Sequence, residues 1–209
     1  MSKLLSSMMC GFYISLGAIV YLIIPDKIVG GIFFALGIFL VLNFNKFLFT
    51  RVVPLLPISD DFKPIDAVFA LVGNSIGAFI TAVLISLTRI MDKIEIPIHD
   101  LVEIKLQDNL ISLFVMAIFC GILVGYAVYF SRKYEKGSFA QIFYVWLYIS
   151  AFVFCGFDHI VANSFYFSAY GLEFGFSLSM ILPFIVVAIG NTVGGLLLGF
   201  VEKKNMSEK

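Results

Sequence analysis

Long apolar runs separated by short polar stretches dominate this chain. Six such runs follow one another, and most approach the roughly 20 residues that an α-helix needs to cross a bilayer. They cover about residues 4–24, 28–44, 65–87, 110–130, 139–157 and 178–201. Proline and charged residues close the runs, as in Pro25-Asp26-Lys27 and Glu202-Lys203-Lys204. The pattern therefore predicts an all-α integral membrane protein with six transmembrane helices.

The composition supports this class and leaves little room for anything else. Of the 209 residues, 61% are hydrophobic and 13% are charged, whereas soluble domains average about 45–50% and about 25%. We expect residues 1–209 to form a single transmembrane domain embedded in membrane lipid. The formal net charge is zero, so no overall basic field favours nucleic acid as a partner.

The basic residues divide unequally between the two sides of the predicted bundle. If the N-terminus is inside, ten lie on the inner side: Lys3, Lys46, Arg51, Lys63, Arg132, Lys133, Lys136, Lys203, Lys204 and Lys209. Four lie on the outer side: Lys27, Arg89, Lys93 and Lys105. Cytoplasmic loops carry the excess of lysine and arginine. We therefore expect a multi-pass protein of the plasma (bacterial inner) membrane with both termini in the cytoplasm.

An internal repeat divides the chain into two halves, at about residues 4–88 and 108–201. The third run contains Gly73-Asn74-Ser75-Ile76-Gly77, and the sixth contains Gly190-Asn191-Thr192-Val193-Gly194. Three spans per half is an odd number, so the second half must enter the membrane upside down, as in inverted-repeat transporters. Close helix packing explains the glycines. The two asparagines need hydrogen-bonding partners in an apolar setting, which indicates a shared structural role.

Polar residues interrupt the fifth run within a few positions of one another. Asp158, His159 and Asn163 lie in an apolar stretch that extends from residue 139 to residue 169, longer than one span requires. Ionisable groups inside a membrane usually face a cavity or a pathway. The alternative is that Asp158 and His159 cap a helix end at the interface. The length of the stretch favours a helix that breaks inside the membrane.

The second run is interrupted in a similar way. Lys46, Thr50 and Arg51 are followed by Pro54 and Pro57, and proline breaks helices. Either this helix is also broken, with the Thr50 hydroxyl at the break, or the run simply ends there with Lys46 reaching toward water. The interruption alone does not choose between the two.

Residues 89–108 join the third and fourth runs and carry charges of both signs, which predicts a solvated outer loop. Lys105 lies in it, and its spacing alone favours an ordinary interfacial lysine. The three cysteines, Cys10, Cys120 and Cys155, are widely scattered, as are the two histidines. No spacing typical of a metal site or a disulfide framework occurs, and we expect no metal and no cofactor.

Five features in order resemble the formate/nitrite transporter family over about residues 7–200. They are Cys10-Gly11 with Gly17, the glycines of residues 30–37, Leu48-Phe49-Thr50, the two glycine–asparagine pairs, and Gly156-Phe157-Asp158-His159 with Ala162-Asn163. The last is the most specific, because it is similar to the signature of the family's broken fifth helix. This chain departs from the family at Phe47, Gly125 and Ser164, where an acidic residue, Asn and Met are usual.

The resemblance implies an aquaporin-like protomer with helices 2 and 5 broken, assembled as a homopentamer. It implies passage of small monovalent anions such as formate, nitrite or hydrosulfide, often with protons. By the same resemblance, His159 is the central pore histidine, Thr50 faces it and Asn163 holds the break. Further residues inherit positions in the pore: Phe34 and Phe152 at the periplasmic constriction, Ile38, Leu48 and Phe49 at the cytoplasmic one, and Lys105 in the vestibule.

Elementary electrostatics agrees with that scheme. The free-energy cost of removing a bare anion from water into an apolar slot is far greater than the cost for a neutral weak acid. A proton taken from water or through His159 would neutralise the anion first. The closest alternative is a pore for a neutral solute such as water, ammonia or urea. A non-conducting homologue is a further one. An intramembrane enzyme is disfavoured, because Asp158 and His159 have no nucleophile or second metal ligand at a useful spacing.

Overall fold

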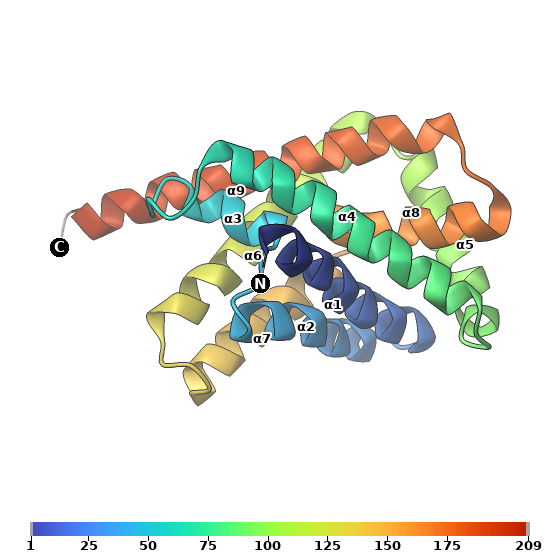
Figure 1. The fold of residues 1–209 in the computed structure, drawn as a ribbon, viewed down its shortest axis with the longest axis horizontal. Helices are drawn as coiled ribbons and strands as arrows, with labels where there is room; N and C mark the ends of the chain where they lie inside the picture. The colour runs from blue at the N-terminus through green and yellow to red at the C-terminus, as the bar shows by residue number, and fades with distance from the viewer. Residues whose placement is uncertain (1, 208–209) are drawn as a thin grey trace.

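The computed structural model describes residues 2–207, and within that range all regular secondary structure is helical (Figure 1). Lys209, counted above on the inner side, lies outside the described residues. The helices are α1 Lys3–Ile23, α2 Lys27–Asn43, α3 Phe49–Leu55, α4 Pro64–Ser86, α5 Met91–Gln107, α6 Leu110–Lys133, α7 Phe139–Phe154, α8 Ile160–Phe174 and α9 Ile181–Ser207, with a 3₁₀ turn at Leu178–Met180.

Short polar residues at the edges of the apolar runs start several of these helices. The Asp26 carboxylate accepts hydrogen bonds from the first backbone N–H groups of α2. Asn109 and Ser138 do the same for α6 and α7. Such caps satisfy N–H groups that have no partner inside the helix. The boundaries predicted from the apolar runs therefore agree with these helix starts to within a few residues.

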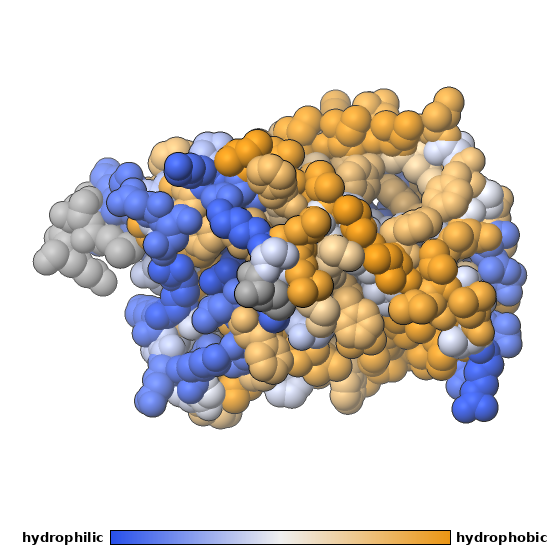
Figure 2. Space-filling view, viewed as in Figure 1, coloured by the Kyte–Doolittle hydropathy of each residue, from blue (hydrophilic) through white to orange (hydrophobic). Residues whose placement is uncertain are grey.

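On the face seen in Figure 2, the surface between the two ends of the molecule is mostly apolar. Within the described residues, four helices are long and apolar enough to cross a membrane: α1, α4, α6, and Leu178–Asn205, which includes most of α9. The apolar helices α2 and α7 are shorter. Large side chains such as Phe69, Ile111 and Phe200 are more than half exposed on this surface. An exposed apolar surface of this extent requires lipid or a partner protein around it.

The connection between α4 and α6 corrects one prediction, because it is a helix rather than a loop. Within α5, Met91, Ile94, Ile98, Val102 and Lys105 are buried, at intervals of three or four residues that place them on one helix face. The helical spacing of these apolar residues was not recognised in the sequence, because they form only a narrow face of α5 and charged residues lie between them. The helix covers α8 and the end of α1.

Equivalent glycines bring the helices together in the two halves. Gly77 lies so close to α1 that an added Cβ would stand 1.9 Å from the carbonyl oxygen of Met8. In the second half, a Cβ on Gly194 would stand 2.1 Å from the carbonyl oxygen of Ile118. These glycines allow α4 to pack on α1 and α9 to pack on α6 at backbone contact distance.

Substitution Gly77→Ala is expected to destabilise the fold, because the new methyl group would overlap rigid backbone of α1. Overpacking of this kind typically costs about 1–3 kcal/mol. The matched control is Gly31→Ala, whose Cβ would meet nothing closer than 3.4 Å. Thermal unfolding in detergent should show a lower midpoint for the first variant alone. Equal midpoints for both variants would contradict the importance of the close approach.

Candidate functional site

Two short non-helical segments, residues 44–48 and 155–159, precede α3 and α8. Each contains one residue in the left-handed backbone region: Asn45 with φ 49° and Gly156 with φ 71°. Glycine adopts such φ values freely and asparagine tolerates them. The chain therefore turns at equivalent places in the two halves. After each turn, the N-terminus of a short helix lies in the protein interior, with its positive dipole end facing inward.

Asn74 holds the first of these segments. Its side-chain oxygen accepts a hydrogen bond from the N–H of Phe49 at 2.9 Å. Its NH₂ group donates to the carbonyls of Ser7 at 2.9 Å and Phe47 at 3.1 Å. One buried amide thus connects α4, α1 and the start of α3.

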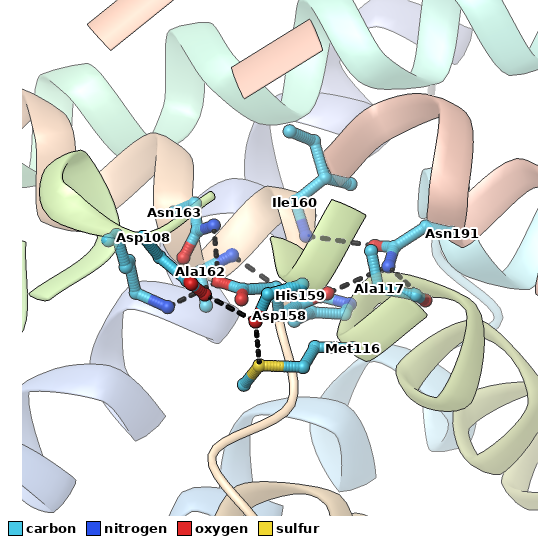
Figure 3. Close-up of polar contacts among 11 residues, drawn as sticks. Asp108, Met116, Ala117, Asp158, His159, Ile160, Ala162, Asn163 and Asn191 are labelled. Atoms are coloured by element: carbon cyan, nitrogen blue, oxygen red, sulfur yellow. Dashed lines mark hydrogen bonds and ion pairs between the residues drawn. The ribbon is translucent and has the colours of Figure 1, made fainter. Parts of the chain in front are cut away.

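Asn191 makes the same three bonds in the second half (Figure 3). It accepts from the N–H of Ile160 at 2.9 Å and donates to the carbonyls of Ala117 at 2.8 Å and Asp158 at 2.7 Å. Each of the two asparagines thus holds the backbone of the non-helical segment in its own half. In each segment, the amide binds the carbonyl of one residue and the N–H of the residue two positions later. The residue between them is Leu48 in the first half and His159 in the second.

His159 is buried and caps α8. Its Nδ1 accepts a hydrogen bond from the N–H of Ala162 at 3.2 Å, and its Nε2 lies 3.0 Å from Oγ1 of Thr50. A ring nitrogen that accepts a hydrogen bond carries no proton. Because Nδ1 accepts from Ala162, the ring proton of a neutral His159 lies on Nε2. Nε2–H then donates to the Thr50 hydroxyl. This hydrogen bond joins the starts of α3 and α8.

Beside His159, Asp158 forms a buried ion pair with Lys105 of α5. Asn163 donates to the same carboxylate oxygen at 3.0 Å. The prediction from spacing alone, an ordinary interfacial lysine, is wrong because Lys105 is only 8% exposed. The sequence did carry a signal for this pair, since a carboxylate inside an apolar run needs a partner.

A cavity brings five of the sequence-predicted site residues together: Phe34, Lys105, Phe152, His159 and Asn163. The rings of Phe34 and Phe152 meet edge to face with centroids 5.7 Å apart. The ring of Phe152 lies 5.7 Å from that of His159. Thr50 joins the group through its hydrogen bond to His159. The aromatic pair therefore stands directly beside the histidine.

The remaining predicted residues, Ile38, Leu48 and Phe49, do not line this cavity. They are buried in the apolar core, where Leu48 and Phe49 lie at the start of α3. Sequence reasoning missed the two tyrosines in the lining, Tyr21 and Tyr166, as well as the apolar Leu101 and Val153. Within apolar runs a tyrosine resembles any other core aromatic residue, and no spacing rule marks these two.

The fold built around this site also occurs in solved structures that are described as channels. A solved structure described as an FNT family ion channel superimposes with a TM-score of 0.85 at 22% identity, covering 97% of this chain and 89% of the other. A structure described as a pentameric formate channel with formate bound gives a TM-score of 0.85 at 21% identity, covering 99% and 97% of the two chains. At these identities, the likeness establishes the fold.

The sequence identifies the family. The formate/nitrite transporter family model matches residues 1–202, and the chain belongs to that family. The formate-nitrite transporter of Plasmodium knowlesi (strain H) is 36% identical over 66 residues, which is 32% of this chain and 21% of that relative. The resemblance proposed from the sequence is thus confirmed. The family and the structural neighbours are channels and transporters, which indicates a multi-pass membrane protein that is not an enzyme.

Proposed function

We propose that this chain forms a channel for a small monovalent anion or its conjugate weak acid, of the formate, nitrite or hydrosulfide type. The observation that carries the proposal is the buried contact between His159 and Thr50 beside the aromatic pair Phe34–Phe152. A narrow apolar slot next to a titratable ring suits a permeant that changes its protonation state on the way. Membership of the formate/nitrite transporter family supports the same assignment.

We propose six spans for residues 1–209, which form one channel domain, with α2–α3 and α7–α8 each acting as one interrupted span. The equivalent asparagine bonds and the equivalent left-handed residues support an inverted repeat of about residues 4–88 and 108–201. Irregular backbone is tolerated at membrane depth only where protein or a pathway satisfies its polar groups. Asn74 and Asn191 supply those partners.

Assembly and orientation follow from separate observations. A homopentamer is supported by the solved neighbour that is described as pentameric. The surplus of basic residues on the inner side supports cytoplasmic termini in a plasma (bacterial inner) membrane. In this orientation, α5 covers the periplasmic vestibule and Lys105 lies within it.

In the proposed mechanism, the anion enters the vestibule and acquires a proton before it passes between Phe34 and Phe152. Neutralisation removes most of the desolvation penalty of the slot. His159 can take up a proton only at Nδ1, because Nε2 already carries one. Protonation at Nδ1 releases the N–H of Ala162, so proton transfer through His159 is coupled to the start of α8. A proton taken directly from water leaves this cap intact.

One observation favours a second candidate, a pore for a neutral solute such as water, ammonia or urea. Asp158 compensates the positive charge of Lys105 within the cavity. A vestibule without net charge attracts anions less strongly than an unpaired lysine would.

Tracer uptake into proteoliposomes separates the two candidates. We expect formate and nitrite uptake to exceed urea uptake and to rise as the external pH falls, because a lower pH favours proton delivery to the anion through His159 before it enters the slot. Liposomes without protein provide the background at each pH. The anion assignment would be overturned if urea uptake equalled formate and nitrite uptake at every pH and none of them changed with pH.

A further inference from the structure

Two buried tyrosines line the cavity and have hydroxyl groups without a protein partner. Tyr21 comes from α1 and is 8% exposed, and Tyr166 comes from α8 and is 6% exposed. Within residues 2–207, neither hydroxyl makes a hydrogen bond to another protein group. Buried polar groups are nearly always satisfied by protein, water or ligand. These two hydroxyls are therefore available to whatever occupies the cavity.

Both tyrosines line the cavity that also contains the aromatic pair Phe34–Phe152. Tyr21 packs edge to face on Phe34, with ring centroids 6.4 Å apart, and Phe34 packs on Phe152. Tyr166 lines the same cavity as these three rings. Lys105 lines the same cavity.

The side chains of Tyr21, Tyr166 and Lys105 offer the cavity more hydrogen-bond donors than the protein itself uses. A phenol can donate one hydrogen, and an ammonium group can donate three, of which Asp158 occupies one on Lys105. A ligand with several acceptor atoms and no need to donate matches such a cavity. Carboxylate and nitrite oxygens are strong acceptors, whereas sulfur accepts hydrogen bonds weakly.

We propose that Tyr21 and Tyr166 recognise the oxygen atoms of a small oxyanion before it enters the slot between Phe34 and Phe152. The inference rests on the proposed function and narrows it: the site favours formate or nitrite over hydrosulfide. Water satisfies the two hydroxyls when no anion is bound. The oxyanion displaces it and can also accept from the ammonium hydrogens of Lys105 that Asp158 does not occupy.

Isothermal titration of sodium formate, sodium nitrite and sodium hydrosulfide into the solubilised, full-length protein tests this directly. The double variant Tyr21→Phe/Tyr166→Phe keeps both rings and removes only the hydroxyls. We expect formate binding to weaken about tenfold for each hydroxyl, equivalent to about 1.4 kcal/mol each. Hydrosulfide binding should change by less than about twofold. Tyr144→Phe, which alters a tyrosine in the stacked aromatic group of α6 and α7, is the matched control.

Binding and transport are measured separately, so the two proposals fail in different ways. Formate binding that is equal in the wild type and the double variant overturns the role of the tyrosines, as does an equal loss for hydrosulfide. A wild-type protein that binds neither formate nor nitrite overturns it as well. Absence of anion flux in proteoliposomes, with tyrosine-dependent binding intact, refutes the channel function alone.

Discussion

Replacement of His159 by asparagine is expected to abolish the rise in formate uptake at low external pH. Asparagine can still accept the N–H of Ala162 and cap α8, but it cannot exchange a proton. We expect uptake at about pH 5 to fall at least tenfold, which corresponds to about 1.4 kcal/mol at the barrier. Proteoliposome flux across a pH series measures the effect, and thermal unfolding verifies that the fold is retained.

His99 provides the matched control for this experiment. It is the only other histidine in the sequence, and its side chain is 45% exposed on α5. The variant His99→Gln should reproduce the wild-type pH profile. Unchanged flux and pH response in His159→Asn would remove His159 from the mechanism and leave a proton taken from water as the remaining route.

The second large effect is expected at the ion pair of Lys105 and Asp158. Substitution Lys105→Met leaves the Asp158 carboxylate buried without its countercharge, which costs about 3–5 kcal/mol when such a pair is broken from one side. The double variant Lys105→Met/Asp158→Asn removes both charges and keeps an acceptor for Asn163. We expect the single variant to melt well below the wild type and the double variant to recover most of the loss.

Lys93 is the control for this pair, because it is an exposed lysine on the same helix. Lys93→Met should change the stability by no more than about 0.5 kcal/mol. A single variant Lys105→Met as stable as the wild type would show that Asp158 is compensated without the lysine, by water or by protonation. In that case the pair would contribute little to the fold.

The sequence predicted the parts of this structure that depend on neighbouring residues. Apolar runs and their polar edges located the long helices, since a cap such as Asp26 acts on the residues that follow it. The repeated glycine–asparagine pairs were also visible, because the same contact is needed twice. Asn74 and Asn191 make matching bonds for that reason.

Contacts between distant parts of the chain could not be predicted in the same way. Lys105 and Asp158 are separated by 53 positions, and the lysine alone resembles an ordinary interfacial residue. Helix α5 escaped prediction because its apolar face is narrow and its other faces are charged. Tyr21 and Tyr166 come from different halves, and only the fold brings them to one cavity.

The matched asparagine bonds have a consequence for how selectivity can change in such a protein. Each amide binds the backbone on both sides of one residue, and that residue's own side chain takes no part in the bonds. The residue between the bound backbone groups is Leu48 in one half and His159 in the other. These hydrogen bonds involve only backbone groups of the two segments. The side chains at the two positions can therefore vary without loss of the bonds. The two halves can thus use the same backbone hydrogen bonds while one holds an aliphatic side chain and the other a titratable one.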